Sequence, residues 1–250
     1  MKKTKDLSKY ISGTYFSIRV GLAVMAFAFP ILLWLGGHFL ADVPLQGSMS
    51  AYYHASLHSL DGGPAGQGVM RDVFVGILFA VGVILFLYQG VTRLEDYAVN
   101  LAGLLALGIA LFPMQWSPGS ELPGKLHEAF ALSFFLCIAY VAIFRAGDTL
   151  PLIPTEAARK RYRLLYMIVG GAMVGCPVLA FALALLPALT NYKIFFIEVA
   201  GIYAFGSYWA IKTRELSETD FDRKAAHGKI YVEPHGLADA VHRIHLRESP

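Results

Sequence analysis

Six long apolar stretches decide what this chain can fold into. They cover residues 18–40, 70–89, 97–114, 126–144, 164–186 and 194–211. The hydrocarbon core of a bilayer is about 30 Å thick, and an apolar helix of about 20 residues crosses it. Inside lipid, backbone polar groups must be satisfied within the segment, so each stretch is predicted to be a helix rather than an open strand. We therefore expect an all-α, six-helix transmembrane bundle over residues 1–211.

Composition agrees with this expectation. Hydrophobic residues make up 56% of the chain, charged residues only 16%, and the mean hydropathy is +0.53. A soluble domain carries about a quarter of its residues as Asp, Glu, Lys and Arg, because its surface faces water. The first apolar stretch is longer than the core of a signal peptide, so we expect it to be retained as a helix.

The basic residues predict the orientation of the bundle. Of the 21 Lys and Arg residues, 18 fall in residues 1–19, 90–96, 145–163 and 212–250, which are the two termini and alternate connections. Only Arg71, Lys125 and Lys193 fall on the other side. Basic residues are enriched in cytoplasmic loops, so both termini are predicted to be cytoplasmic. Residues 212–250 are then a polar cytoplasmic tail.

Small residues recur within two of the apolar stretches. Gly171 and Gly175 form a GxxxG pair, and Ala200 and Ala204 have the same spacing. Small residues four apart allow helix backbones to approach closely in lipid. We expect these faces to pack inside a compact bundle.

Polar residues that lie in or beside the apolar stretches gather on the predicted outer side. They are Ser48, Ser50 and His54 in the first outer loop, Arg71 and Asp72 where the second stretch begins, His127 near the start of the fourth, and Glu198 in the sixth. Ionisable residues at membrane depth usually face a bundle interior or a cavity. These seven residues are predicted to form a polar pocket.

Glu198 is the only carboxylate clearly inside an apolar stretch. An ionised carboxylate in lipid is costly, so we expect it to face the bundle interior and to contact Arg71, Asp72, His127 or His54. Two readings stay open: a residue of the pocket, or a structural ion pair or carboxylate that reaches the surface.

The first outer loop, residues 41–69, is predicted to fold back over the bundle. Its first half combines serines and histidines with two tyrosines, and its second half contains the irregular sequence Gly62–Gly66. Tyrosine suits a boundary between apolar and wet surroundings. We expect Ser50 and His54 to approach Asp72 and His127; the alternative is a loop that its tyrosines anchor flat on the lipid.

Three of these residues have side chains that zinc accepts. They are His54, Asp72 and His127, and an active zinc site needs three such ligands and a water. No CxxC or HExxH motif accompanies them. We expect no cofactor, with zinc as the alternative.

Several motifs carry a resemblance to a known group of proteins. They are Ser48–His54 (SMSAYYH), Arg71–Gly76 (RDVFVG), Glu95–Gly103 (EDYAVNLAG), Ala110–Pro113 (ALFP) and His127 at the head of the fourth stretch. With these the chain resembles a family of uncharacterised six-pass bacterial membrane proteins and, more distantly, the damage-regulated autophagy modulator group. The resemblance implies a six-helix fold and a multi-pass protein of the bacterial cytoplasmic (inner) membrane; it implies no reaction.

A weaker resemblance leads to the ceramidase and progestin-receptor superfamily of membrane metal hydrolases. Ser50 and His54 are similar to its Ser-x-x-x-His element, and Asp72 to its separate aspartate. The later His-x-x-x-His pair of that superfamily is missing, since His242 and His245 have a different spacing and lie on the other side.

Three functions follow as hypotheses. The first is a membrane protein whose outer pocket binds a lipid headgroup, a small ligand or a partner protein. The second is a membrane-embedded, zinc-dependent lipid hydrolase, in which the metal activates water. The third is a transporter, which the lack of an internal repeat and the scarcity of charge in the inner half of the stretches disfavour. Membrane lipids are expected partners and nucleic acid is not; whether the protein is an enzyme is left open.

Overall fold

The computed structural model describes residues 7–54, 68–115, 121–184, 192–232 and 244–246. The helices that follow one another are α1 (Leu7–Ala41), α2 (Val69–Leu87), α3 (Arg93–Leu111), α4 (Glu121–Tyr140), α5 (Glu156–Ala184), α6 (Lys193–Glu218) and the short α7 (Phe221–Ala226). Shorter elements are the 3-10 turn η1 (Ser50–Tyr53), the π turn η3 (Val141–Arg145) and the 3-10 turn η4 (Ala146–Leu152). Strand β1 (Ile230–Val232) pairs antiparallel with β2 (Ile244–Leu246).

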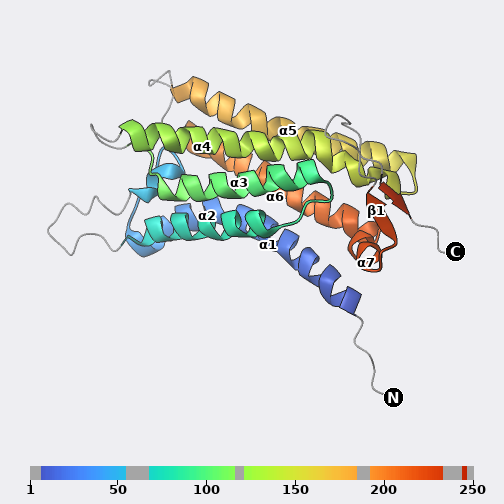
Figure 1. Ribbon diagram of the computed structural model, residues 1–250. Coiled ribbons are helices and arrows are strands. Elements are labelled where there is room, and N and C mark those ends of the chain that lie inside the picture. The colour runs from blue at the N-terminus through green and yellow to red at the C-terminus, as the bar shows by residue number, and fades with distance from the viewer. Residues whose placement is uncertain (1–6, 55–67, 116–120, 185–191, 233–243, 247–250) are drawn as a thin grey trace, which may run out of the picture.

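Six of the helices are long and apolar enough to cross a membrane: α1, α2, α3, α4 with its continuation to Leu152, α5 and α6. The expectation of an all-α chain with six such helices is confirmed, apart from the short strand pair. Helix α1 begins and α6 ends at the same end of the bundle, where α7 lies (Figure 1). We call this the α7 end, and the opposite one, with the loop after α1, the η1 end.

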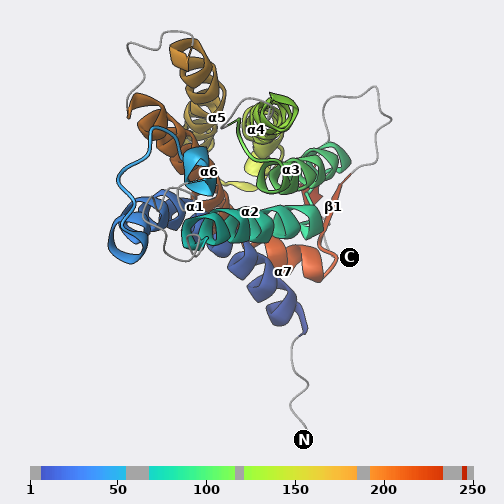
Figure 2. The ribbon, with the colours of Figure 1, turned by 90° about the vertical axis from the view of Figure 1, so that its left-hand side faces the viewer.

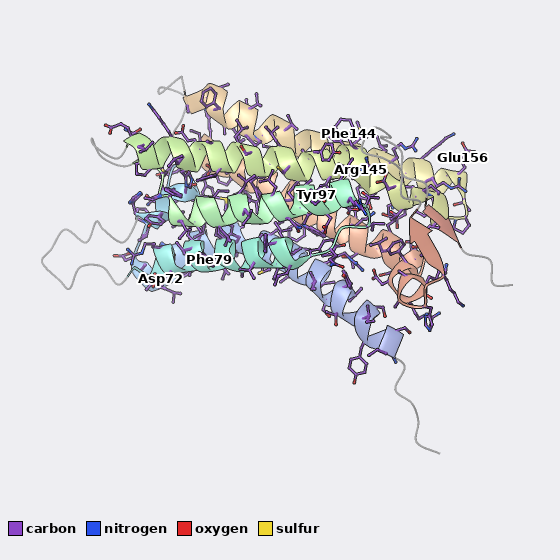
Figure 3. The ribbon with its side chains drawn as sticks, in the orientation of Figure 1. Asp72, Phe79, Tyr97, Phe144, Arg145 and Glu156 are labelled. Carbon is purple, nitrogen blue, oxygen red and sulfur yellow. The ribbon has the colours of Figure 1, made fainter. Side chains whose placement is uncertain are left out.

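Large apolar side chains cover the outside of the helices. Val24 of α1 is 59% exposed, Leu104 of α3 51% and Ile168 of α5 57%. Phe79 of α2 and Phe144 of η3, both labelled in Figure 3, are likewise exposed. A soluble protein rarely exposes contiguous apolar surface of this extent, whereas lipid covers it readily.

The six long helices form a closed ring in sequence order. Each of them packs against its neighbours along the chain, and α6 packs against α1, which closes the ring. Figure 2 shows this arrangement from the η1 end. Phe134 of α4 and Phe205 of α6 meet in the interior, with ring centroids 5.5 Å apart. The core is therefore the inside of one bundle.

Two glycines allow α2 and α3 to approach closely. A Cβ on Gly103 of α3 would lie 2.6 Å from the carbonyl oxygen of Gly82 in α2, and one on Gly82 would lie 3.0 Å from the Gly103 carbonyl oxygen. The two backbones therefore touch, as the short connection between α2 and α3 requires.

The expectation for Gly171 and Gly175 is wrong. A Cβ on either would meet nothing within 4 Å, so this pair does not pack inside the bundle. Their neighbour Gly170 does, because a Cβ there would lie 2.5 Å from Cγ1 of Ile143. The helix presents a face offset by one residue from the one that the GxxxG spacing indicated.

The α7 end contains buried charged side chains, nearly all of them just beyond the ends of the predicted apolar stretches. Lys212 Nζ lies 3.0 Å from Glu215 Oε2, and both side chains are at most 1% exposed. Tyr166 donates to the same carboxylate at 2.5 Å, and Thr149 donates to its other oxygen. Helix α6 thus continues through the start of the predicted tail, because residues 212–218 have partners on α5 and η4.

A second buried ion pair joins the two ends of the chain. Arg19 of α1, 1% exposed, contacts both carboxylate oxygens of Asp222 in α7. A third links Arg145 to Asp148 at 2.5 Å. Buried charges are tolerated only when they are paired, so these contacts hold α7 and η4 against the bundle. Within the predicted tail, residues 233–243 and 247–250 lie outside the described residues, and residues 244–246 form strand β2.

Candidate functional site at the η1 end

The loop after α1 turns back onto the bundle. Its first contact is the Val43 amide, which donates to the Gly37 carbonyl oxygen at 2.9 Å. Gly37 leaves room for the Tyr52 ring, since a Cβ there would lie 2.8 Å from Tyr52 Cε1. The amide of Phe195 in α6 donates to the Gly47 carbonyl oxygen at 2.9 Å. The fold-back predicted for this loop is confirmed for residues 42–54, whereas Gly62–Gly66 lie outside the described residues.

Tyr52 is part of the core rather than of an interfacial anchor. Its side chain is 0% exposed and packs against Phe195. Burial raises the pKa of the Tyr52 phenol, which therefore stays neutral. The loop is held by buried aromatic contacts, and the alternative of a loop lying flat on the lipid does not describe this part of it.

Ser50 and His127 are brought into direct contact. Ser50 begins η1, and its Oγ lies 2.8 Å from Nε2 of His127 on α4. The other ring nitrogen of His127, Nδ1, lies 2.8 Å from the carbonyl oxygen of Phe112. The imidazole is 5% exposed and thus sits between the loop and the end of α3.

The Phe112 carbonyl fixes the direction of these hydrogen bonds. A carbonyl oxygen only accepts, so Nδ1 of His127 must carry the proton and donate. In the neutral imidazole Nε2 is then an acceptor, and the Ser50 hydroxyl donates to it. Phe112 follows the last residue of α3 and precedes Pro113, so its carbonyl has no place in a continuing helix. His127 supplies the missing donor.

Glu198 faces the bundle interior as predicted, but it has partners other than those expected. Ser48 Oγ donates to Glu198 Oε1 at 3.1 Å, and the Met49 amide donates to Oε2 at 2.5 Å. The loop passes over α6 before α2 begins, so its own donors reach the carboxylate. The Nε atom of Arg71 instead lies 3.8 Å from Oδ1 of Asp72, and both side chains are at the surface.

Ser48 connects the two halves of the site. Its Oγ accepts from the Ser50 amide at 3.1 Å while its hydroxyl donates to Glu198. The hydrogen bonds therefore run from Glu198 through Ser48 and Ser50 to His127, and end at the Phe112 carbonyl.

The remaining predicted residues lie apart from this chain of hydrogen bonds. His54 Nε2 lies 3.1 Å from the Met114 carbonyl oxygen. Arg71 and Asp72 are 49% and 71% exposed at the η1 end of α2, where Figure 3 shows Asp72 at the surface. The expected approach of Ser50 and His54 to Asp72 is not found, because the Asp72 side chain is exposed at the start of α2. His54, like His127, makes further interactions within the described structure.

The same placements bear on the zinc alternative. Within the described residues, no three His, Cys, Asp or Glu side chains form a group that could hold a metal ion. Both nitrogens of His127 have other partners, and Asp72 lies at the surface. The geometry does not support His54, Asp72 and His127 as a ligand set, and zinc stays a prediction.

An apolar cavity lies below Ser50 and Glu198. It has a volume of about 90 Å³ and is enclosed by α1, α2, α3, α4 and α6. Its walls include Phe29, Phe74 and Phe134, and its polar boundary comes from Ser50 and Glu198. A hydroxyl and a carboxylate thus stand at the edge of an otherwise hydrocarbon-lined space.

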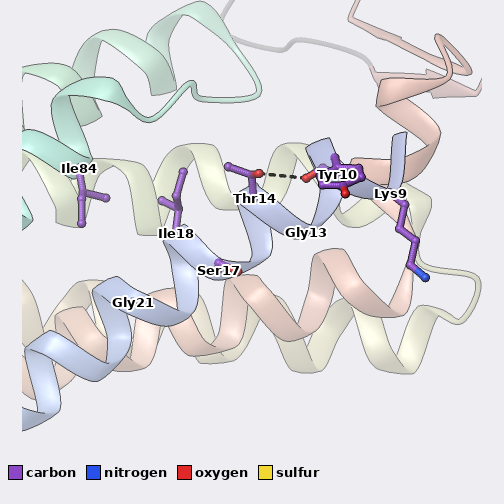
Figure 4. Close-up of a pocket in the computed structure, with 8 residues that line it drawn as sticks. All are labelled: Lys9, Tyr10, Gly13, Thr14, Ser17, Ile18, Gly21 and Ile84. Atoms are coloured by element: carbon purple, nitrogen blue, oxygen red, sulfur yellow. Dashed lines mark hydrogen bonds between the residues drawn. The ribbon is translucent and has the colours of Figure 1, made fainter. Parts of the chain in front are cut away.

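A larger hollow runs along the N-terminal part of α1 (Figure 4), with a volume of about 840 Å³. Its lining includes Gly13, Ser17 and Gly21, and a Cβ on either glycine would meet nothing within 4 Å. Thr14 Oγ1 donates to the Tyr10 carbonyl oxygen at 3.0 Å, a bond within the helix itself. This is an open helix face, and no set of polar side chains converges on it.

The sequence identified Ser48, Ser50, His127 and Glu198 as site residues. It did not indicate the Phe112 carbonyl or the buried charges of the α7 end. A backbone carbonyl has no signature in side-chain identity, although the Phe112–Pro113 step marks where α3 must end. Arg145 and Lys212 stand three residues before their partners Asp148 and Glu215, a spacing that pairs side chains on a helix, whereas Asp222 lies 203 residues from Arg19 and has no such signal.

Comparison with known protein families, with curated proteins and with solved structures finds no match for this chain. What the site does must therefore be argued from its geometry.

Proposed function

We propose that the protein spans the bacterial cytoplasmic membrane with the η1 end on the outer side and the α7 end in the cytoplasm. Support comes from the 18 of 21 basic residues that belong to the α7 half of this topology. The exposed pair Lys160–Glu156, at the start of α5, also belongs there.

We propose further that the η1 end binds an amphipathic molecule, namely a membrane lipid. The observation that carries this proposal is the cavity, whose polar boundary is Ser50 and Glu198 and whose walls are aromatic and aliphatic. Ligand sites combine a mostly apolar lining with a few placed polar groups in this way. The polar head would lie at Ser48 and Ser50, and the apolar part would enter the cavity.

The size of the cavity limits what enters it. Its volume of about 90 Å³ corresponds to roughly three waters at ~30 Å³ each. Apolar cavities of such size tend to stay dry and to accept hydrocarbon instead. An alkyl segment fits the space, whereas a whole lipid would leave most of its length outside in the bilayer.

Filling the cavity tests the proposal. Ala131 of α4 lines it, so Ala131→Leu should occupy the space that the alkyl segment needs. Ala129 lies on the same helix but is exposed, and Ala129→Leu is the matched control. In native mass spectrometry of detergent-purified protein with added diacyl phospholipid, we expect a retained lipid with the wild type and with Ala129→Leu. Ala131→Leu should lose it while keeping its helical circular dichroism.

Equal lipid retention in Ala131→Leu would contradict the proposal. The zinc-dependent hydrolase, the transporter and the family resemblance stay predictions, since no observation at this site favours them over lipid binding.

A further inference from the structure

We propose that Ser50 and His127 are a nucleophile and general base that transfer an acyl group from an ester-linked lipid to Ser50 and then to water. This rests on the proposed lipid binding, whose site it turns into an active site. The reaction needs no metal, since a serine hydroxyl and an imidazole supply both the attacking atom and the proton transfer.

The geometry of the Ser50–His127 pair supports this reaction. Ser50 Oγ and His127 Nε2 are 2.8 Å apart, within the range in which a base activates a hydroxyl. The Phe112 carbonyl holds Nδ1–H at 2.8 Å and so leaves Nε2 free to accept. In a Ser–His–Asp triad the aspartate performs this orientation, and here a backbone carbonyl occupies its position.

The position of Ser50 beside the cavity also supports this reaction. A serine whose only role was to hold the loop after α1 against α4 would not need to border a hydrocarbon-lined space. Ser50 borders the cavity, as does Met49 beside it. An alkyl segment in the cavity would place the ester carbonyl that follows it next to Ser50 Oγ. The acyl chain is thus the part of the substrate that the cavity selects.

Hydrogen bonds through Ser48 and Glu198 hold the backbone at Ser50 in place. Its amide donates to Ser48 Oγ at 3.1 Å, and the Ser48 hydroxyl donates to Glu198 at 3.1 Å. Glu198 also accepts from the Met49 amide at 2.5 Å. Ser48 and Glu198 are therefore positioning residues, which set the backbone that carries the nucleophile.

His127 Nε2 takes the Ser50 hydroxyl proton while Oγ bonds to the ester carbonyl carbon. The tetrahedral intermediate collapses, the bond from carbon to the alcohol oxygen breaks, and His127 returns the proton to the leaving alcohol. Water then loses a proton to His127, attacks the acyl-serine, and releases the fatty acid; the proton returns to Ser50 Oγ.

A long-chain alkyl fluorophosphonate tests the proposal on the full-length, detergent-purified protein. Serine attack on phosphorus expels fluoride and leaves one covalent adduct, which peptide mass spectrometry locates. We expect the adduct on Ser50 in the wild type and none in Ser50→Ala. Ser207→Ala, which removes a serine of α6 away from the cavity, should react like the wild type.

His127→Asn separates catalysis from structure. The asparagine amide can still donate to the Phe112 carbonyl, but it places no base where Nε2 lies. A general base contributes about 10²–10⁴-fold to rate, so labelling of Ser50 should slow by about 100-fold or more. The same variant should retain lipid as the wild type does, a readout that a merely structural histidine would not leave intact.

The outcomes distinguish acyl transfer from lipid binding alone. Wild-type protein that retains lipid but forms no adduct overturns acyl transfer and leaves lipid binding standing. Labelling that persists in Ser50→Ala, or at an unchanged rate in folded His127→Asn, also overturns it. Protein that neither retains lipid nor reacts overturns both. The Ser50→Ala comparison stands even where the histidine variant does not fold.

Discussion

His127 Nε2 lies 2.8 Å from Ser50 Oγ, although 77 residues separate the two along the chain. The contact joins the loop after α1 to the start of α4, which are not neighbours in the helix ring. It fixes the loop over the bundle interior and makes the position of η1 depend on the first turns of α4.

The anchoring of that loop by Glu198 can be measured. Glu198→Ala removes the acceptor of the Met49 amide and of the Ser48 hydroxyl, and leaving such groups unpaired costs about 1–3 kcal/mol each. We expect faster amide hydrogen exchange at Met49 and Ser50. Glu198→Gln, which keeps one carbonyl acceptor, should show a smaller change. Glu128→Ala, at an exposed position of α4, is the control and should leave the exchange at η1 as it is.

The crossing of α2 and α3 gives a second prediction. Gly103→Ala would put a Cβ 2.6 Å from the Gly82 carbonyl oxygen and from the Phe86 amide nitrogen, so the two backbones must separate. Overpacking of this kind typically costs about 1–3 kcal/mol, and backbone contacts cannot relax as side chains do. We expect a lower thermal unfolding midpoint in detergent.

Gly171→Ala is the matched control for that experiment, because a Cβ there meets nothing within 4 Å. Alanine is favoured over glycine within a helix by about 1 kcal/mol. The midpoint should stay or rise. A loss in Gly171→Ala as large as in Gly103→Ala would contradict the assignment of the two faces.

The buried pair at the α7 end gives a third prediction. Lys212→Met leaves Glu215 without its cation at 0% exposure, and breaking a buried pair costs about 3–5 kcal/mol. Arg214→Met breaks an exposed pair with Glu218, which solvent screens, so its loss should change stability little. Equilibrium unfolding should therefore separate two substitutions only two residues apart.

A double variant refines that test. Lys212→Met combined with Glu215→Met removes both charges, so part of the lost stability should return. A double variant less stable than Lys212→Met would mean that Glu215 contributes chiefly through Thr149 and Tyr166 rather than through the lysine.

The orientation of the bundle is a fourth prediction. A reporter fused where the predicted tail begins, at residue 212, would interrupt the fold, because α6 continues to Glu218 and α7 to Ala226. The fusion point should therefore follow Pro250, so that α6, α7 and both strands are retained. Fusions within Gly62–Gly66 should report the outer side. The reverse result at either point would invert the sidedness proposed for the site.

The sequence predicted the six helices because apolar runs of membrane length have few alternatives in lipid. It missed their ends. The helix α1 begins at Leu7 and α6 reaches Glu218, well beyond the apolar runs at 18–40 and 194–211. Polar residues extend a helix where tertiary partners bury them, and hydropathy does not register such partners.

The site was predicted in part for the same reason. The depth predicted for Ser50, His127 and Glu198 in the membrane placed all three at one end of the bundle. Which of them touch depends on the path of the loop and on rotation of each helix about its axis. A backbone carbonyl and a neighbouring serine became the decisive partners, whereas Arg71 and Asp72 turned to the surface.

The ion pair of Arg19 and Asp222 has a consequence for how the protein is made. The two residues are 203 positions apart, and a ribosome adds about 5–20 residues per second. Arg19 is therefore synthesised roughly 10–40 s before its carboxylate exists. For that interval the Arg19 guanidinium has no carboxylate partner, and water or lipid phosphate must solvate its charge. Nascent chains that stop before Asp222 keep this charge without its carboxylate.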